Sequence, residues 1–427
     1  MRRIKVVLEA RGPLLLGDGL PAGNVQSSRP FVAGSVLRGT LARAILLPQG
    51  LWGPGAGRGG AVPEEVRRVF LEEPVARFGF LYPVREAGES AGAKDAFPIP
   101  LTARTCKSHR GFRSDGGHGV LDGLPGRLRR VTEGPGAGIG GCPVCGERLE
   151  RMRGFAVRGT PRDPATYRES PVHPRAFVRV GLNRGTETAE EGILYTLEAL
   201  VPGPGGEGQE QPLSFTGYWV MEDDQWQTLR GLIRRYLPEE DGAYPLRIGS
   251  ARARGMGAVA LRWMEEPGGH LPPLEERLEA FQPRGEGGEP LDPAHLYFAL
   301  TLRAPLLLYD PAGQPATRPD PPVLEPYISR LPGSLEFLPE TSEMEREDWT
   351  GWSAAWGLPK PVVSAIGAGS VLAFRASAGE QEAVLAFLRE VEENGLGEHR
   401  AEGWGEAVAC DPLHIVLDTS GGPTWER

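Results

Sequence analysis

Residues 249–257 read G-S-A-R-A-R-G-M-G, and residues 397–405 read G-E-H-R-A-E-G-W-G, so both fit the spacing G-x-x-R-x-x-G-x-G. A second pair of matching stretches lies far upstream, where residues 11–18 read R-G-P-L-L-L-G-D and residues 303–310 read R-A-P-L-L-L-Y-D. Two matches in the same order predict two copies of one domain, and a chain of 427 residues has room for both.

The elements around the repeats indicate the fold class. Each copy begins with an alternating, strand-like segment, at 4–16 and at 296–308. A helical pattern precedes each glycine loop, at 223–236 and at 380–393, and a short apolar stretch typical of a strand follows it. Glycine loops that bind nucleotides have the opposite order, with the strand before and the helix after. We therefore expect an α+β fold of the split βαβ type and no nucleotide-binding turn.

The two copies differ in length. The matching stretches lie 238 residues apart in the first copy and 94 apart in the second, so the first holds 144 additional residues. Gly, Pro and Glu are concentrated between the copies, as is typical of an exposed linker. The predicted boundaries are a first domain at 1–264 with an insertion at about 50–170, a linker at 265–293 with a short helix at 274–281, and a second domain at 294–427.

Composition indicates in which cellular compartment the protein is found. No apolar run approaches the roughly 20 residues of a membrane span. Charged residues interrupt the short apolar run at the N-terminus, unlike the run of a signal peptide. Four cysteines are too few for a disulfide scaffold in a chain of this length. We expect a soluble, cytoplasmic protein.

Charge is distributed unequally along the chain. Residues 1–264 contain 36 Lys+Arg and 28 Asp+Glu, whereas residues 265–427 contain 11 and 28. Opposite polarity indicates different partners for the two halves. Nearly all positive charge is arginine, which binds phosphate with two donors and stacks on bases. A GC-rich genome would explain the number of arginines equally well, so their positions carry more information than their count.

The segment G-S-V-L-R-G at 34–39 precedes a predicted helix at 40–47. A glycine-serine turn at a helix N-terminus offers backbone N–H groups to an anion. Ser35 and Arg38 are therefore candidate phosphate contacts. The alternative is an ordinary helix cap with an exposed arginine.

A basic hairpin is predicted from two alternating strands, 177–184 and 192–200. Basic side chains on an exposed hairpin can follow a phosphate backbone, which makes Arg179 and Arg184 candidate RNA contacts. The alternative is a solvated hairpin whose arginines pair with nearby acids, namely Glu187, Glu190 and Glu191.

Cys142-Pro-Val-Cys145 forms a knuckle in which two thiolates can hold one metal ion. Together with the upstream Cys106 and His118 they supply the four ligands of tetrahedral zinc, and His109 competes with His118. The insertion has few apolar residues, so a structural zinc ion would explain how it folds. A redox pair and free thiols are the alternatives. Cys410 is expected in the core.

These features together resemble the RAMP superfamily of CRISPR effector subunits. The chain looks like the large two-domain subunit of type III-D systems, which also carries a cysteine-histidine insertion. The resemblance rests on G-S-V-L-R-G at 34–39, V-R-V-G-L-N-R at 178–184, the two glycine loops at 249–259 and 397–408, and T-C-K-S-H, H-G-V-L-D and C-P-V-C-G in the insertion.

The resemblance implies tandem ferredoxin-like, RRM-related domains with a large zinc-knuckle-type insertion in the first. It implies a subunit of an RNA-guided antiviral complex that binds the guide RNA near its 5′ repeat-derived tag. The implied partners are the guide RNA, other effector subunits including a large signalling subunit, and target RNA through the complex. The implied RNA contacts are Ser35, Arg38, Arg179, Arg184, Arg252, Arg254, Gly255, Gly257 and Arg400.

The second glycine loop departs from the first, because Glu398, Glu402 and Glu406 flank Arg400. This puts RNA binding by that loop in doubt and favours a protein neighbour for the acidic domain.

We expect no catalytic activity. The first alternative is a guide-processing endoribonuclease, which requires a general base such as His399 or His173. The second is metal-dependent cleavage of target RNA, for which Asp18 is the candidate. Its counterpart Asp310 also ends the matching stretch, so both are more simply turn formers. A stand-alone RNA-binding regulator is the third alternative.

Overall fold

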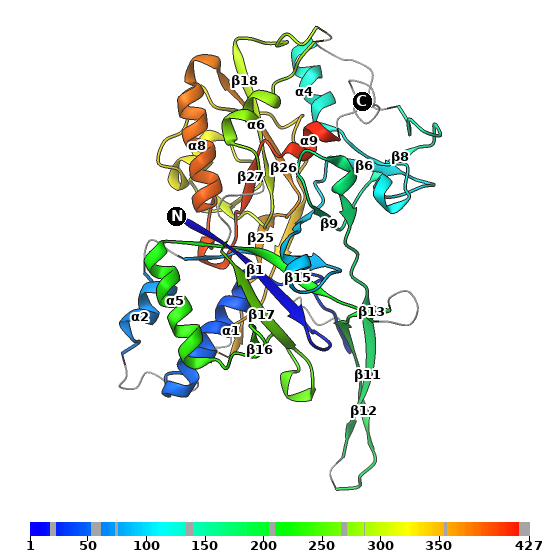
Figure 1. Cartoon of the computed structure of the whole chain (residues 1–427), viewed down its shortest axis with the longest axis vertical. Coiled ribbons are helices and arrows are strands. Elements are labelled where there is room, and N and C mark those ends of the chain that lie inside the picture. Colours follow the sequence, from blue (N-terminus) through cyan, green and yellow to red (C-terminus); the bar gives the residue numbers. More distant parts are fainter. Residues whose placement is uncertain are drawn as a thin grey trace. The chain divides into compact units, whose positions relative to one another are not determined.

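The computed structural model describes residues 1–17, 23–52, 61–72, 76–133, 140–183, 185–204, 210–265, 271–285, 287–353 and 357–417. Within these ranges the protein has a mixed α+β fold, which confirms the predicted fold class (Figure 1). No helix there is long and apolar enough to cross a membrane. Contacts divide the chain into two compact units: unit 1 comprises 1–94, 171–266 and 348–363, and unit 2 comprises 95–170, 267–347 and 364–427.

Unit 1 contains an antiparallel sheet with the strand order β16-β17-β1-β15-β3, and β4 also pairs with β15. Its principal elements in chain order are β1 (Arg2–Ala10), α1 (Gly34–Leu46), α2 (Glu64–Phe70), β3 (Arg77–Phe78), β4 (Tyr82–Val84), α3 (Gly88–Gly92), β15 (Ser214–Met221), α5 (Asp223–Tyr236), β16 (Tyr244–Arg247) and β17 (Ala258–Met264).

The alternation of β1 explains the core of unit 1. Every second residue, from Ile4 through Val6 to Leu8, is fully buried and packs with the apolar faces of α1 and α5. α5 begins at a capping box, in which the side chains of Glu222 and Gln225 accept from backbone N–H groups. The apolar stripe predicted for this helix consists of Trp226, Leu229, Ile233 and Tyr236, of which the first three are buried and Tyr236 is half-buried.

Unit 2 contains a four-stranded antiparallel sheet with the order β21-β26-β18-β27. The corresponding strands of unit 1, β3, β15, β1 and β17, lie in the same order. The principal elements of the second sheet are β18 (His295–Leu302), α7 (Pro321–Leu324), β21 (Glu336–Phe337), β26 (Val371–Ser377), α8 (Gln381–Asn394), β27 (Ala407–Ala409) and α9 (Pro412–Val416).

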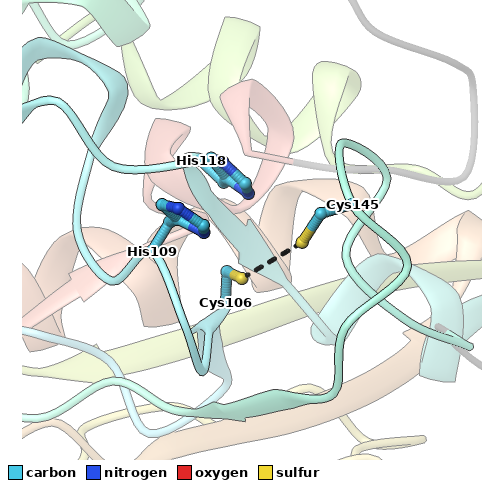
Figure 2. A group of neighbouring side chains, drawn as sticks. All are labelled: Cys106, His109, His118 and Cys145. Atoms are coloured by element: carbon cyan, nitrogen blue, oxygen red, sulfur yellow. Dashed lines mark hydrogen bonds between the residues drawn. The ribbon is translucent and has the colours of Figure 1, made fainter.

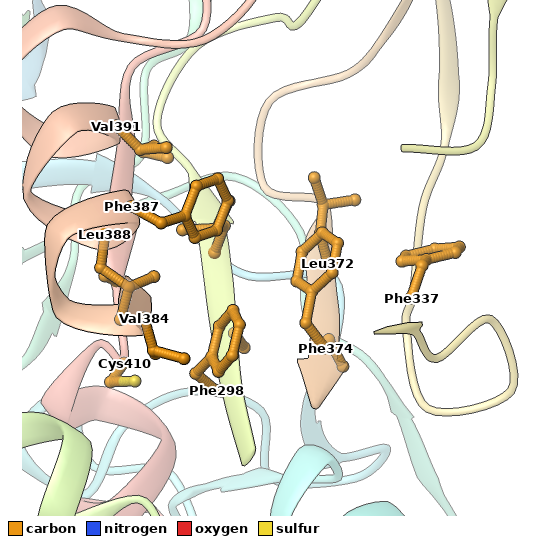
Figure 3. Close-up of a cluster of buried hydrophobic side chains, with 14 of the residues drawn as sticks. Phe298, Phe337, Leu372, Phe374, Val384, Phe387, Leu388, Val391 and Cys410 are labelled. Carbon is orange, nitrogen blue, oxygen red and sulfur yellow. The ribbon is translucent and has the colours of Figure 1, made fainter. Parts of the chain in front are cut away.

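Aromatic packing holds α8 against the sheet of unit 2, as Figure 3 shows. The rings of Phe298 and Phe374 stack with centroids 5.7 Å apart, and Phe387 from α8 meets Phe298 edge to face at 6.2 Å. Cys410 is fully buried beside them, as predicted, and burial raises the pKa of its thiol to about 12. It is therefore a core residue without nucleophilic character at neutral pH.

The repeated stretches of sequence contact each other in each unit. The amide of Gly257 donates to the carbonyl of Pro13 at 2.8 Å, and the amide of Gly405 donates to that of Pro305 at 2.8 Å. A Cβ atom on Gly257 would lie 2.2 Å from the carbonyl oxygen of Ile248, so only glycine fits there. The two motifs recur together because they form one contact.

The two glycine loops also share an unusual backbone conformation. Ala251 and His399 occupy the same position of each loop with φ of 53° and 57°, although neither is glycine. Gly255 and Gly403 follow with φ of 86° and 83°. Between them each loop forms one turn of 3-10 helix. The loops are therefore conformational copies that differ in side chains.

The division by contacts differs from the boundaries predicted from sequence. Residues 95–170 fall in unit 2, although they interrupt the first copy in the sequence. Buried ion pairs explain this, because Arg158, fully buried, contacts Asp411 at 2.6 Å and Asp95 at 2.8 Å. Arg303 binds the other carboxylate oxygen of Asp411 at 2.8 Å.

The predicted linker also differs from the expectation that it is exposed. Its helix α6 (Leu274–Ala280) buries Leu274 and Leu278 in the core of unit 2. The guanidinium of Arg277 forms two hydrogen bonds of 2.8 Å with the carboxylate of Glu392 on α8. Part of this segment therefore belongs to the packed structure.

The remaining elements of residues 95–170 form small sheets. Their bounds are β5 (Asp95–Pro98), β6 (Ala103–Cys106), β7 (Val120–Asp122), α4 (Leu124–Glu133), β8 (Leu149–Arg151), β9 (Phe155–Arg158) and β10 (Arg168–Glu169), with strand orders β10-β9-β5 and β7-β6-β8.

Candidate nucleic-acid interface and metal centre

The predicted basic hairpin is confirmed as a two-stranded ribbon in unit 1 (Figure 1). β11 (Pro174–Leu182) pairs antiparallel with β12 (Ala189–Leu200), and β12 pairs with β2 (Val25–Gln26). Most side chains of β11 are exposed on both faces, so the ribbon has no core of its own. Such a ribbon presents its polar and apolar side chains to a partner.

Arg179 is exposed on β11 and lies directly opposite Tyr195 on β12. Directly paired residues share one face of a ribbon. Arg179 forms no ion pair with any residue of the described ranges. Arg184 lies outside the described residues, as do the side chains of Glu190 and Glu191, so the alternative pairing within the hairpin stays untested.

The first glycine loop packs against this hairpin. Arg254 donates a hydrogen bond of 2.9 Å to the hydroxyl of Tyr195, and its guanidinium lies 5.5 Å from the centre of that ring. Beneath this contact a small apolar cluster joins Leu15, Leu197, Ala199 and Met256. The structure thus brings Arg179, Tyr195 and Arg254 to one place. Sequence analysis missed Tyr195, although the register of the hairpin places it opposite Arg179.

Positive charge is concentrated around the loop. Burial lowers the pKa of Arg252, and the neighbouring charge of Arg43 on α1 lowers it further. Arg247 donates to the backbone carbonyl of Arg252 at 3.0 Å. In the part of the chain that the structure describes, none of these three arginines or Arg254 has a carboxylate within ion-pair distance. An unneutralised cluster of this kind attracts an anion such as phosphate.

The helix-opening motif has a different environment from the one expected. α1 begins at Gly34, so Ser35 lies in its first turn and is half-buried. The guanidinium of Arg38 donates to the carbonyl of Phe70, the last residue of α2. Arg38 therefore donates to a carbonyl at the C-terminal end of α2, which has no partner within its own helix. A different arginine of α1, Arg43, lies near the first glycine loop.

The sheet of unit 1 offers no open platform for bases. On the face away from α1 and α5, Lys5, Thr216 and Tyr218 are buried, and α3 contacts both β1 and β15. The ammonium of Lys5 donates to the carbonyl of Lys94 at 2.7 Å and to the hydroxyl of Tyr218 at 3.1 Å.

The second glycine loop carries opposite charge on the same backbone. Glu402 occupies the position of Arg254, and Arg400 occupies that of Arg252. Gly255 and Gly257 have their counterparts in Gly403 and Gly405, so backbone shape does not distinguish the loops. The second loop therefore carries less positive charge than the first on an equivalent backbone.

The metal candidates converge in unit 2, as Figure 2 shows. Ligand atoms of Cys106, His109, His118 and Cys145 all lie within 4.8 Å of one another. This group contains three of the predicted ligands and has His109 in place of Cys142. The sulfur of Cys142 lies 3.5 Å from Nδ1 of His118.

The spacing of these atoms fits tetrahedral zinc. Zinc–sulfur and zinc–nitrogen bonds of about 2.3 Å and 2.0 Å place two sulfurs about 3.8 Å apart and a sulfur and a nitrogen about 3.5 Å apart. Cys106 and Cys145 have sulfurs 3.6 Å apart, and Cys142 and His118 are 3.5 Å apart. The separation also excludes a disulfide, whose sulfurs lie about 2 Å apart.

The two thiols of the knuckle differ, because the amide of Glu147 lowers the pKa of Cys145 but burial and the neighbouring thiols raise it overall. The amide of Gly146 donates to the carbonyl of Cys142 at 2.7 Å and closes the turn. Burial raises the pKa of the Cys142 thiol, but the amides of Cys145 and Val144 donate to its sulfur, and the pKa is lowered overall. Burial, with the charges of His109 and Arg113, lowers the pKa of His118. Thiolate and neutral imidazole are the forms that bind metal.

The two histidine candidates have no carboxylate partner in the described ranges. His399 and His173 are exposed, and neither bonds to a carboxylate of the described ranges. His399 instead meets the ring of Trp404 edge to face at 5.4 Å. Asp18 lies outside the described residues. Its counterpart Asp310 accepts the amides of Ala312 and Gln314 at 2.9 and 2.8 Å, as a turn former does.

No model of a protein family matches the chain, and neither does any curated protein sequence. Among solved structures it is similar to a chain of the type III-B Cmr-beta complex bound to cognate target RNA and AMPPnP, with 10% identity, 86% of each chain covered and a TM-score of 0.39. A RAMP protein binding different RNA substrates is 9% identical over 96% of this chain and 99% of that one, with a TM-score of 0.29. Oligomeric Cmr4 from Pyrococcus furiosus is 10% identical over 63% and 100%, with a TM-score of 0.25.

Proposed function

We propose that this protein is a non-catalytic structural subunit of a type III-D-like, RNA-guided CRISPR effector complex, where it binds the guide RNA near its 5′ repeat-derived tag. The observation that carries the proposal is the joined surface of Arg179, Tyr195 and Arg254, which combines an exposed ribbon with an unneutralised arginine loop. Arginines and an aromatic ring at one place are the side chains that hold a single-stranded RNA backbone and its bases.

The strand order supports tandem ferredoxin-like domains. With the additional short elements left aside, the order is β1, α1, β3, β15, α5, β17 in unit 1 and β18, α7, β21, β26, α8, β27 in unit 2, and the last strand lies beside the first. This is the order of the split βαβ fold. The shared glycine loops would then mark equivalent positions, of which only the first is basic.

The acidic half is assigned to protein contacts. Residues 265–427 carry 28 acids against 11 bases, and the second loop repels phosphate through Glu398, Glu402 and Glu406. A basic surface on a neighbouring effector subunit, for which the large signalling subunit is the expected candidate, fits this half. Zinc, held by the cysteine-histidine cluster, has a structural role in the proposal.

The proposal includes no catalysis by this chain. A histidine that acts as general base is commonly oriented by a hydrogen-bonded carboxylate, and His399 and His173 have no carboxylate beside them in the described ranges. No observation favours the processing endoribonuclease or the metal-dependent nuclease over the structural role.

The proposal is tested by measuring guide-RNA binding to the full chain as a function of salt. Arg252→Ala should weaken binding and reduce the slope of log K against log salt by about 0.7 to 1. The matched variant Arg400→Ala, at the equivalent position of the second loop, should change binding less. Equal losses in the two variants would reject the asymmetric assignment.

A further inference from the structure

We infer that the metal-bearing segment forms a second surface for single-stranded RNA, carried by Lys107, Arg110 and Arg148 and held in shape by the metal ion. The nature of the partner rests on the proposed function, since that proposal already makes RNA a ligand of the chain. The surface itself rests on separate observations within unit 2.

The metal-bearing segment, residues 95–170, has an excess of positive charge. Residues 95–170 contain 13 Lys+Arg and 8 Asp+Glu, whereas residues 171–264, which hold the hairpin and the first glycine loop, contain 10 and 12. The positive excess of the first half of the sequence therefore lies partly in the metal-bearing segment. The residues that carry this excess are separate from those of the hairpin and the first glycine loop.

Several arginines of this segment form ion pairs within unit 2. Arg104, Arg127 and Arg151 all contact the carboxylate of Glu343, and these contacts hold the segment within unit 2. Arg153 similarly binds Glu345 at 3.0 Å. These arginines have a structural role in unit 2, and the two carboxylates balance half of their four positive charges.

Lys107, Arg110 and Arg148 behave differently. All three are exposed, and none has a carboxylate within ion-pair distance in the described ranges. Burial raises the pKa of Glu169 and the charge of Arg110 opposes this effect, but the two side chains form no ion pair in the described ranges. The three cations are therefore available to an anionic partner.

These three cations lie close to the candidate metal ligands. Lys107 follows Cys106 in the chain, and its amide donates to the carbonyl of Arg148 at 3.0 Å, so the two residues lie across from each other. Arg110 follows His109 directly. Each cation thus lies within a few residues of a metal-binding atom, and the metal ion fixes their spacing.

The side chains beside these cations explain why single-stranded RNA is favoured over an acidic protein. The exposed ring of His109 stacks on His118 with centroids 4.0 Å apart and an angle of 11°. Val144 at the tip of the knuckle is 53% exposed. A flat ring and an apolar tip between cations offer stacking to unpaired bases. Neither a nucleic-acid duplex nor an acidic peptide has unpaired bases to stack on them.

The test uses the full chain loaded with zinc and a short, unstructured, fluorescein-labelled oligouridylate. The double variant Lys107→Glu/Arg148→Glu should weaken binding about tenfold or more, because two phosphate contacts become repulsive. The matched control is Arg153→Glu/Arg162→Glu, which makes the same change in charge at residues that are 58% and 59% exposed and already paired with acids. The control should change binding less than about twofold.

Zinc content and the unfolding midpoint, measured for both double variants, establish that the segment stays folded. Equal losses in the two double variants, or none in Lys107→Glu/Arg148→Glu, would overturn the inference. If that variant binds RNA normally but loses a protein subunit from the assembled complex, the surface contacts protein and the inference is likewise wrong.

A hairpin variant separates this inference from the proposed function. If Arg179→Ala/Arg254→Ala loses guide binding while Lys107→Glu/Arg148→Glu retains oligouridylate binding, the proposed function stands and the second surface fails. If Arg179→Ala/Arg254→Ala binds the guide normally and only the knuckle variant loses RNA, the second surface stands and the hairpin assignment fails.

Discussion

The guanidinium of Arg254 donates a hydrogen bond of 2.9 Å to the hydroxyl of Tyr195, so the first glycine loop and the basic hairpin form one surface. The equivalent position of the second loop is Glu402, on a backbone of the same conformation. Side-chain charge, with the fold held constant, therefore distinguishes the two loops.

Exchanging this one side chain tests the difference. Arg254→Glu gives the first loop the residue of the second, and we expect guide-RNA affinity to fall at least about tenfold at low salt, with a smaller salt slope. Tyr195→Phe, which removes only the hydrogen bond, should cost less. Binding measured by fluorescence anisotropy decides this, and unchanged affinity in Arg254→Glu would contradict the role of the loop.

Metal content tests the cysteine-histidine cluster. Protein purified without added metal should contain about one zinc ion per chain. Cys142→Ser should lower that content and destabilise residues 95–170, because the knuckle then loses a ligand beside His118. Elemental analysis and hydrogen exchange measure both effects. Less than about a tenth of an equivalent in the unmodified protein would reject the zinc site.

Glycine substitutions test the contact between the repeated motifs. Gly257→Ala should destabilise unit 1 strongly, since its Cβ would lie 2.2 Å from a backbone oxygen at a φ of 87°. Gly255→Ala is the matched control, because its φ is 86° but nothing lies within 4 Å, so only about 1–2 kcal/mol of backbone strain is expected. Chemical denaturation compares them. Equal destabilisation would show that crowding is unimportant.

A buried histidine predicts how stability depends on pH. Burial lowers the pKa of His414, but the carboxylate of Asp122, 3.1 Å from its Nδ1, and that of Asp411 outweigh this effect and raise the pKa overall. Arg303 opposes them, and Thr301 contacts Nε2 at 2.7 Å. The contribution of the charged imidazole is therefore complete below the unfolded pKa of about 6.5 and is lost as pH rises through the folded value.

Comparison with His414→Gln isolates this contribution. Removing one member of a buried pair should cost about 3–5 kcal/mol at pH 6. The difference in unfolding free energy between the two proteins should shrink as pH increases above about 6.5. The depressed pKa of Asp122 has its effect only at acidic pH, so it does not interfere. A difference that is constant from pH 6 to pH 9 would contradict a charged imidazole.

Local patterns predicted the parts of the fold that rest on local interactions. The stripe on α8 was predictable because Val384, Phe387, Leu388 and Val391 recur at helical spacing, and all are buried. The hairpin was predictable because its strands alternate, with turn residues between them. The sequence also indicated the metal cluster, since the ligand types and the Cys-x-x-Cys spacing are specific.

Interactions between residues far apart in the sequence were not predictable. Arg158 binds Asp411 across 253 positions, and no local pattern indicates that this pair places residues 95–170 in unit 2. Arg43 likewise meets Arg252 only through the packing of α1. Arg38, which the motif favoured, instead binds a helix terminus, a contact that depends on where α2 ends.

The central claim is that this chain binds a guide RNA through the hairpin and the first glycine loop. Crosslinking the tagged chain in its native complex with ultraviolet light, then sequencing the bound RNA and mapping the crosslinked peptides, tests it most directly. We predict RNAs that begin with a repeat-derived 5′ tag, joined to peptides within 174–200 and 249–257. Recovery of unrelated transcripts only, or of guide RNA joined solely to residues 397–405, would contradict it.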